Sequence, residues 1–150
     1  VLILGAGGVG SAIAASGAKA GAGEIALADT RADAAERLAE RLRRNFPNLE
    51  LSLGSNDPSR FDIAVNATPL GTDPGDPLPM DPSRLSPSAL VGEVVLKPAI
   101  TPFLAAAKAR GLACVTGLDM LFEQIPAYLE FFGFPTATAA ELRETAELKN

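Results

Sequence analysis

A glycine-rich turn directly after a short apolar run restricts the fold of this chain more than any other feature. Residues 1–4 are Val-Leu-Ile-Leu, and residues 5–10 read Gly-Ala-Gly-Gly-Val-Gly, which matches G-x-G-x-x-G. Small helix formers follow from Ser11 to the region of Ala20. A continuous apolar run suits a strand buried on both faces of a parallel sheet. Strand, turn and helix in this order predict the first unit of an α/β sheet.

Strand and helix signals continue to alternate along the rest of the chain. Six prolines place residues 69–87 in a long loop. We expect further strands at residues 24–28, 49–53, 62–65, 90–96 and 112–115, and helices at 11–20, 31–44, 102–110, 118–132 and 138–148. Because crossovers between parallel strands are right-handed, we predict an α/β doubly wound parallel sheet (a Rossmann fold) of about six strands in the order 3-2-1-4-5-6.

Length and composition exclude several classes of protein. The 150 residues suffice for one domain, and we predict a single dinucleotide-binding domain over residues 1–150. A hydrophobic share of 47% and a charged share of 21% exclude a disordered chain or a coiled coil. The net charge of −5 argues against a nucleic-acid partner. No apolar run is long enough for a bilayer, so we expect no membrane partner and a cytoplasmic location.

The residue inventory also limits catalytic chemistry. The chain has no histidine and one cysteine, Cys114. These counts exclude an internal disulfide, the common zinc sites and any histidine-based triad. We therefore predict no metal site.

In its context, the glycine turn predicts a phosphate-binding loop. Gly5 would permit the tight turn, Gly7 would let a pyrophosphate approach the backbone, and Gly10 would let the helix pack closely on its strand. Free N–H groups and the helix dipole would then converge on the phosphates. The alternative is a glycine-rich turn that binds no ligand.

An acidic residue follows the second predicted strand at the spacing expected for ribose recognition. Asp29 lies 19 residues beyond Gly10, and its carboxylate would attract a ribose 2′-hydroxyl and repel a 2′-phosphate. This position favours NAD as the cofactor over NADP, which stays possible. Asp29 could also cap the next helix. Arg31 could cover the adenine, pair with a phosphate or simply be solvated.

Three later segments, together with the glycine loop, resemble the shikimate and quinate dehydrogenase family. They are Asn-Ala-Thr-Pro-Leu-Gly at residues 66–71, Lys-Pro-Ala-Ile-Thr-Pro-Phe-Leu at 97–104 and Gly-Leu-Asp-Met-Leu-Phe-Glu-Gln at 117–124. The four motifs occur in the family's order and span residues 1 to about 135. The resemblance implies the NAD(P)-binding, C-terminal domain of such an enzyme, with the N-terminal substrate domain absent from this chain.

The resemblance also implies roles for individual residues. The cofactor-binding residues would be Gly5, Ala6, Gly7, Gly8 and Val9 at the pyrophosphate, Asp29, Thr30 and Arg31 at the adenosine ribose, Asn66, Ala67, Thr68, Pro69 and Leu70 beside the nicotinamide, and Val94 and Gly117 where the pocket continues. Gln124 would bind a substrate hydroxyl, and Leu96 takes the place of a substrate-touching tyrosine; without the motif, Gln124 would be an ordinary polar residue on an apolar helix.

The chain departs from the family's pattern at several of these places. Thr30 replaces an arginine typical of NADP-using members, which again favours NAD. Glu93 replaces a frequent aspartate, and Asp119 replaces a usual glycine. Together with Leu96, these changes make the substrate less certain than the class of reaction.

The activity implied by the resemblance is reversible, NAD(P)-dependent hydride transfer. Its products would be shikimate or quinate, formed from 3-dehydroshikimate or 3-dehydroquinate on the chorismate route to aromatic amino acids. The substrate is therefore a cyclic polyol carboxylate. The catalytic lysine and aspartate of the family would precede residue 1, so none of the present residues is expected to be catalytic, and Lys97 is interpreted as a surface lysine. The isolated chain should bind dinucleotide without turnover.

Two other functions stay open at this point. One is a non-catalytic, NAD-binding regulatory domain. The other is an S-adenosylmethionine-dependent methyltransferase, which also uses a glycine-rich first turn and a later acid, although residues 66–71 and 117–124 argue against it. A homodimer also stays open as the assembly.

Overall fold

Six parallel strands form the centre of the computed structural model, which describes residues 1–146 of the chain. Hydrogen bonds join them side by side in the order β3-β2-β1-β4-β5-β6, so the predicted topology is confirmed. The strands are β1 (Leu2–Leu4), β2 (Glu24–Ala28), β3 (Glu50–Leu53), β4 (Ile63–Asn66), β5 (Leu90–Glu93) and β6 (Ala113–Val115). Strand order reverses between β1 and β4, and ligands bind at the carboxyl ends of the strands beside such a point.

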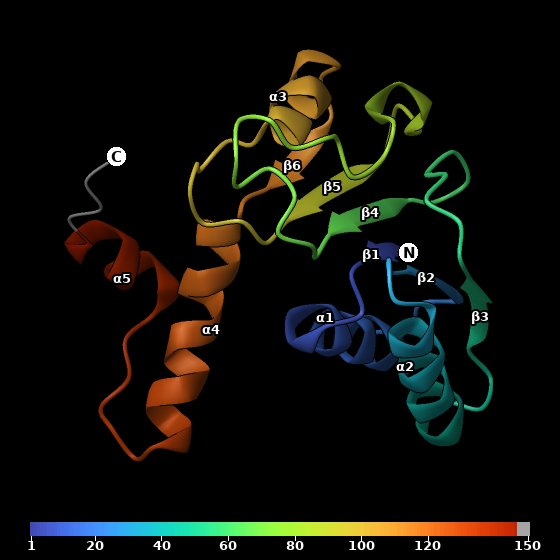
Figure 1. Cartoon of the computed structure of the whole chain (residues 1–150). Helices are drawn as coiled ribbons and strands as arrows, with labels where there is room; N and C mark the ends of the chain where they lie inside the picture. The colour runs from blue at the N-terminus through green and yellow to red at the C-terminus, as the bar shows by residue number, and fades with distance from the viewer. Residues whose placement is uncertain (147–150) are drawn as a thin grey trace.

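Helices cover both faces of the sheet, as Figure 1 shows. The helices are α1 (Gly8–Lys19), α2 (Ala32–Asn45), α3 (Pro102–Ala109), α4 (Gly117–Phe131) and α5 (Ala139–Thr145), with a short 3₁₀ turn, η1, at Pro82–Arg84. Successive strand residues point to opposite faces. Ile3 therefore packs in a core with Leu38 of α2, whereas Leu2 packs in a second core with Phe103 of α3.

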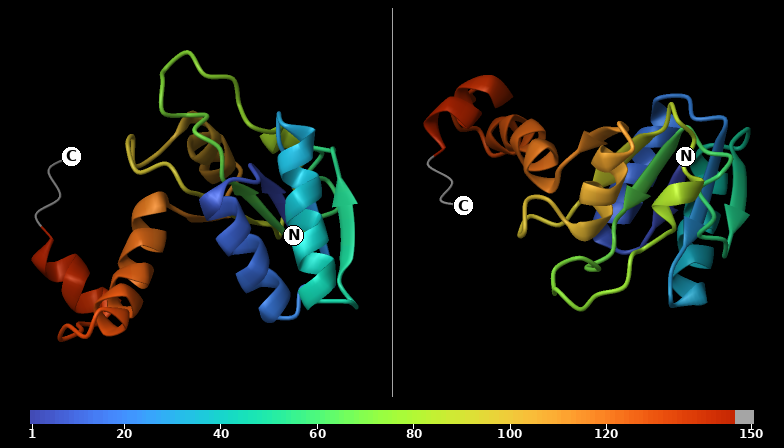
Figure 2. Two further views of the ribbon diagram at one scale, coloured as in Figure 1. Left: turned by 60° about the horizontal axis from the view of Figure 1, so that its bottom comes forward. Right: turned by 90° about the horizontal axis from the view of Figure 1, so that it is seen from above.

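The last two helices project away from the sheet, which is visible in both views of Figure 2. Only Gly117 and Phe122 are buried in α4, and α5 packs along it. Three large aromatic side chains at the far end of this pair, Phe131, Phe132 and Phe134, are 82%, 68% and 62% exposed. The core that positions the strand ends is therefore built without the far half of α4.

Helix α1 and strand β5 have boundaries that differ from the sequence-based expectation by three residues. Helix α1 begins at Gly8, because Gly7 already serves as its N-cap and the Ser11 amide donates to the Gly7 carbonyl oxygen at 2.9 Å. Strand β5 ends at Glu93, well before Leu96, because the Glu93 carboxylate accepts the backbone N–H groups of the next two residues. The long loop contains η1. The expected helix end at Leu148 lies outside the described residues.

Candidate dinucleotide site

The glycine loop is shaped by two close backbone approaches. Gly5 has φ +98°, a left-handed conformation that favours glycine, and a Cβ there would lie 2.5 Å from the Ala67 carbonyl oxygen. A Cβ on Gly10 would lie only 1.9 Å from the Gly5 carbonyl oxygen. The start of α1 therefore sits against the end of β1 at a distance that only glycine allows.

The N-terminus of α1 is open toward the carboxyl edge of the sheet. Gly7 is the N-cap, and within residues 1–146 no side chain accepts a hydrogen bond from the first turn. A Cβ on Gly7 or Gly8 would meet no atom within 4 Å. The first N–H groups of a helix lack partners inside the helix and carry the positive end of its dipole. This end of α1 is therefore suited to an anionic group such as a phosphate.

Asp29 ties the end of β2 to the glycine loop. Its Oδ2 accepts the backbone N–H of Ala6 at 2.7 Å, and its Oδ1 accepts that of Arg31 at 2.8 Å. These two donors, the one from Ala6 first, lower the pKa of Asp29 below its usual value. The N-cap of α2 is Arg31, without a side-chain cap in the described part of the chain, so Asp29 is not the helix cap that the sequence allowed. The Arg31 guanidinium lies 3.9 Å from Asp29 Oδ1 and is 68% exposed.

One cavity of about 290 Å³ brings together three segments predicted from the sequence. They are the glycine loop, the end of β2 and the turn after β4, which lie far apart in the chain but at the same edge of the sheet. Its lining residues are Gly5, Gly7, Asp29, Thr30, Ala67, Thr68, Pro69 and Leu70. Eight of the residues predicted to bind a cofactor therefore share one space, while Gly8 and Val9 are exposed on the first turn of α1 beside it.

Asn66 is placed differently from the rest of the predicted turn. It is fully buried, whereas Ala67 to Leu70 line the cavity. Its Nδ2 donates to the Leu70 carbonyl oxygen at 2.9 Å and to the carboxylate of Glu93. The Asn66 side chain therefore supports the turn from behind, and its place beside the nicotinamide stays a prediction.

Val94 and Gly117 come together next to this turn. A Cβ on Gly117 would lie 2.8 Å from the Val94 carbonyl oxygen and 2.4 Å from that of Val95, so the start of α4 packs on the backbone that follows β5. Asp119, which departs from the family's usual glycine, completes a capping box for α4: its Oδ2 accepts the Thr116 N–H at 3.0 Å, while Thr116 Oγ1 accepts the Asp119 N–H.

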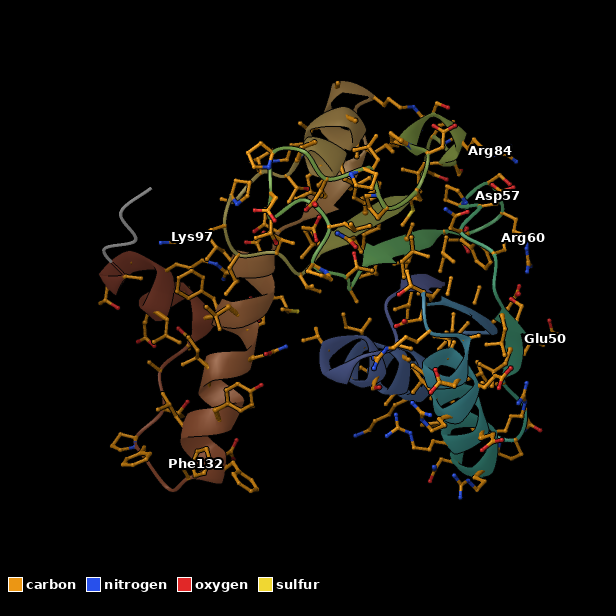
Figure 3. The ribbon with its side chains drawn as sticks, viewed as in Figure 1. Glu50, Asp57, Arg60, Arg84, Lys97 and Phe132 are labelled. Carbon is orange, nitrogen blue, oxygen red and sulfur yellow. The ribbon has the colours of Figure 1, made fainter. Side chains whose placement is uncertain are left out.

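The two predicted substrate residues lie outside the 290 Å³ cavity. Leu96 is 42% exposed in the loop after β5. Gln124 is half-buried on α4, and its Oε1 accepts the hydroxyl of Tyr128 at 3.1 Å. Lys97 is exposed and extends away from the sheet, as Figure 3 shows. Its position agrees with a surface lysine.

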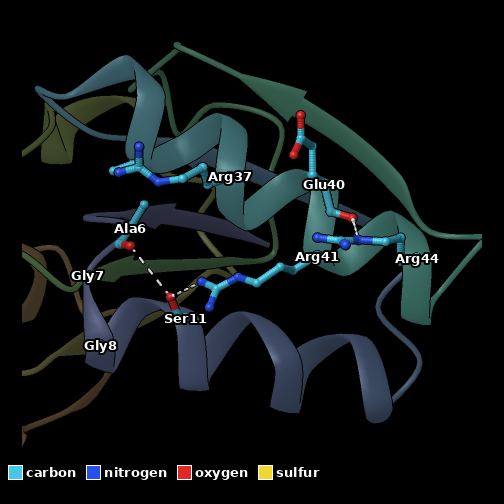
Figure 4. A pocket seen from close by; sticks show the side chains of 9 residues that line it. Ala6, Gly7, Gly8, Ser11, Arg37, Glu40, Arg41 and Arg44 are labelled. Carbon is cyan, nitrogen blue, oxygen red and sulfur yellow. Dashed lines mark hydrogen bonds between the residues drawn. The ribbon is translucent and has the colours of Figure 1, made fainter.

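A larger groove of about 720 Å³ lies between α1 and α2, shown in Figure 4. Its lining residues are Ala6, Gly7, Gly8, Ser11, Ala34, Arg37, Glu40, Arg41 and Arg44. Arg41 Nη2 donates to Ser11 Oγ at 3.1 Å, and Arg37 pairs with Asp33 at 2.5 Å. The sequence-based prediction missed these arginines. Their spacing of four and three residues on a helix could have placed them on one face.

Together, these features define a class of protein. A doubly wound parallel sheet, a glycine turn crowded at Gly5 and Gly10, an uncapped helix N-terminus and a carboxylate at the end of β2 are the features of a dinucleotide-binding Rossmann domain. The donor set suits a pyrophosphate next to a ribose. Within the described residues there is no group of His, Cys, Asp or Glu side chains that could hold a metal ion, and no helix long and apolar enough to cross a membrane.

Comparison with known proteins identifies the relatives of this domain. The chain is 38% identical over 135 residues to the shikimate dehydrogenase (NADP(+)) of Acidiphilium cryptum, a match that covers 88% of the chain and 47% of that protein. It is 35% identical over 144 residues to the shikimate dehydrogenase (NADP(+)) of Azorhizobium caulinodans, covering 95% and 51%. No family model matches the chain.

Solved structures give the same result for the fold. The ligand-free 5-ketofructose reductase of Gluconobacter sp. strain CHM43 matches with a TM-score of 0.83 and 34% identity, over 96% of the chain and 54% of that protein. Quinate dehydrogenase from Corynebacterium glutamicum in complex with NAD matches with a TM-score of 0.83 and 31% identity, over 96% and 53%. The chain spans about half the length of these relatives. Over the matched residues, the chain is similar to about half of each of these shikimate and quinate dehydrogenases.

Proposed function

We propose that the chain is the cofactor-binding part of a shikimate or quinate dehydrogenase-like oxidoreductase. The observation that carries this proposal is the shared cavity, in which the glycine loop, Asp29 and the turn after β4 face one another. The relatives reported above are named as dehydrogenases or as a reductase, and this argues against the methyltransferase alternative. The nicotinamide cofactor, when bound, supplies the hydride chemistry.

The residues of the chain bind and orient that cofactor. Backbone N–H groups at Gly7 to Val9, together with the dipole of α1, hold the pyrophosphate. Asp29 accepts hydrogen bonds from the adenosine ribose beyond those it already accepts, since each carboxylate oxygen can accept more than one. The turn of residues 67–70 contacts the nicotinamide half. The groups that move the hydroxyl proton are proposed to lie outside these 150 residues.

NAD is the cofactor that we propose the chain prefers. The Asp29 carboxylate is held close to the glycine loop, where it would repel a 2′-phosphate, and Thr30 brings no positive charge. Relatives differ on this point: the Acidiphilium cryptum protein is named for NADP(+), and the Corynebacterium glutamicum quinate dehydrogenase was solved with NAD. The preference therefore depends on the local charge rather than on the family.

The proposed substrate class is a cyclic polyol carboxylate, recognised in part by Gln124. Leu96 stands where the family has a tyrosine that touches the substrate, so the contact of this residue with the substrate would differ from the family's. We propose the cytoplasm as the compartment, where the single Cys114 stays reduced.

Calorimetry with NAD and NADP, followed by a turnover assay, tests these proposals. The chain should bind NAD with the lower Kd, and Asp29→Ala should reduce the difference between the two cofactors. Asp62→Ala makes the same substitution at the opposite edge of the sheet, just before β4, and as the matched control it should leave both Kd values unchanged. Equal affinity for NAD and NADP in the unmodified chain would contradict the preference.

The turnover assay separates an enzyme part from a regulatory domain. The chain alone should not oxidise shikimate or quinate, and addition of the separately expressed other half of a relative should restore activity. Cofactor binding without any restored activity would favour the non-catalytic, NAD-binding alternative.

A further inference from the structure

Three polar residues are buried together behind the turn that follows β4. Asn66 and Thr101 are fully buried and Glu93 is 2% exposed, and they are the buried polar or charged residues of the described chain. Asn66 ends β4, Glu93 ends the adjacent β5, and Thr101 is the N-cap of α3. In residues 1–146, no lysine or arginine forms an ion pair with Glu93. The buried acid is therefore stabilised by hydrogen bonds alone.

The Glu93 side chain is the acceptor in each of its hydrogen bonds. Its Oε1 accepts the backbone N–H of Val94 at 2.9 Å and that of Val95 at 3.2 Å. Its Oε2 accepts the Thr101 hydroxyl at 3.0 Å. Asn66 Nδ2 donates to both oxygens, at 2.9 and 3.1 Å. Such a set suits a carboxylate, which only accepts hydrogen bonds.

Asn66 transmits this arrangement to the cavity wall. The same Nδ2 that meets Glu93 also donates to the Leu70 carbonyl oxygen at 2.9 Å. Asn66 Oδ1 accepts the Thr68 hydroxyl at 2.6 Å and the Thr68 N–H at 3.1 Å, and Thr68 Oγ1 accepts the Leu70 N–H at 3.1 Å. Since both ends of the Asn66 amide are engaged, its orientation fixes the conformation of the turn.

Burial of a carboxylate without a neighbouring cation costs free energy that a buried apolar side chain would not. Its donors come from β4, from the backbone after β5 and from the cap of α3, so it joins the three elements on this side of the cavity. We infer that Glu93 is a positioning residue, which acts through Asn66 to hold the turn of residues 67–70 in the shape that receives the nicotinamide half of the cofactor. This inference rests on the proposed function.

The variant Glu93→Gln tests the link because it keeps the size of the side chain and changes one acceptor into a donor. The new NH₂ group would face the Asn66 Nδ2, the Thr101 hydroxyl or two backbone N–H groups. In either orientation of the new amide, one of the two Asn66–Glu93 bonds is lost, and the Asn66 Nδ2 group that also binds Leu70 meets a second NH₂ group. The turn should then be held less firmly, while the glycine loop and Asp29 remain intact.

Calorimetry with NAD and with ADP-ribose, which lacks the nicotinamide, provides the readout. Glu93→Gln should weaken NAD binding by about tenfold, the effect expected when a buried group loses its partner, and change ADP-ribose binding by less than about twofold. Glu93→Asp, which keeps the carboxylate on a shorter arm, should weaken NAD binding by a smaller factor. Glu24→Gln makes the same chemical change at the start of β2, at the opposite edge of the sheet, and should alter neither affinity.

The outcomes separate the inference from the proposed function. Unchanged NAD affinity, or an equal loss for NAD and ADP-ribose, in Glu93→Gln would overturn the positioning role. If Glu93→Gln does not fold, the affinities of Glu93→Asp for NAD and ADP-ribose are compared instead, and a loss confined to NAD supports the positioning role. Failure of the unmodified chain to bind either ligand would overturn the proposed function and the inference with it.

Discussion

Replacement of Gly10 by alanine should destabilise the fold through a single backbone contact. The added Cβ would lie 1.9 Å from the Gly5 carbonyl oxygen, and real Cβ atoms do not approach closer than 3.0 Å. Neither atom belongs to a flexible side chain. The start of α1 must therefore move away from the end of β1 by about 1 Å, a movement that a well-packed core resists.

The size of this stability loss depends on the buried side chains of α1. Ala14 of this helix is fully buried in the same core as Ile3 and Ile25, so the helix cannot move without disturbing that packing. Overpacking typically costs about 1–3 kcal/mol. A backbone overlap this severe should reach the upper end, about 3 kcal/mol, and lower the Tm by about 6–12 °C in a domain of this size.

Thermal and urea unfolding, followed by circular dichroism, measure this loss. Gly8→Ala is the matched control, because it makes the same substitution in the same turn where a Cβ meets nothing within 4 Å. The control should be as stable as the unmodified chain or slightly more stable, since alanine favours a helix. A free energy of unfolding for Gly10→Ala within about 0.5 kcal/mol of the unmodified chain would refute the reasoning.

Three further predictions concern the proposed site and its support. Gly7→Ala should lower the Tm by only a few degrees, because its Cβ enters open space and the only loss is the preference for glycine over alanine at the N-cap of α1. The same variant should raise the Kd for NAD by at least about tenfold, because the pyrophosphate would lie in that space, and normal NAD affinity in calorimetry would contradict this. The backbone N–H groups of Ala6 and Arg31 lower the pKa of Asp29 below its ordinary 3.8, so its stabilising effect is complete above that value and is lost as the pH falls through the lowered pKa. Urea unfolding from about pH 6 to 3 should show the unmodified chain losing its advantage over Asp29→Asn at the acid end, and a constant difference would exclude the effect. Asp119→Ala removes one half of the capping box of α4 and should cost about 1 kcal/mol with a loss of helical signal; equal unfolding curves would show that the cap is dispensable.

The strand order and the glycine turn could be predicted because local sequence determines them. Apolar runs ending at Gly5, Asp29 and Asn66 mark strand ends, and the handedness of crossovers then leaves few topologies. The meeting of the glycine loop with Asp29 and the turn of residues 67–70 follows from that order, because parallel strands present their carboxyl ends at one edge. These parts of the candidate site therefore needed no knowledge of side-chain packing.

The parts that could not be predicted depend on contacts between distant residues. The early end of β5 and the burial of Asn66 both result from Glu93, which lies 27 residues away from Asn66 in the sequence. Hydrophobic periodicity does not predict this contact, because a carboxylate at the end of a strand is usually exposed to solvent. The groove lined by Arg37, Arg41 and Arg44 was missed because its basic face has meaning only once α1 is placed beside α2.

The projection of α4 has a practical consequence for spectroscopy. The chain contains no tryptophan and one tyrosine, Tyr128, which is 54% exposed near the far end of that helix and bonded to Gln124. Intrinsic emission therefore reports on α4 and is silent about the sheet, whereas circular dichroism reports on all helices together. Comparison of the two signals would show whether the projecting helix melts with the nucleotide-binding body or before it, without any introduced label.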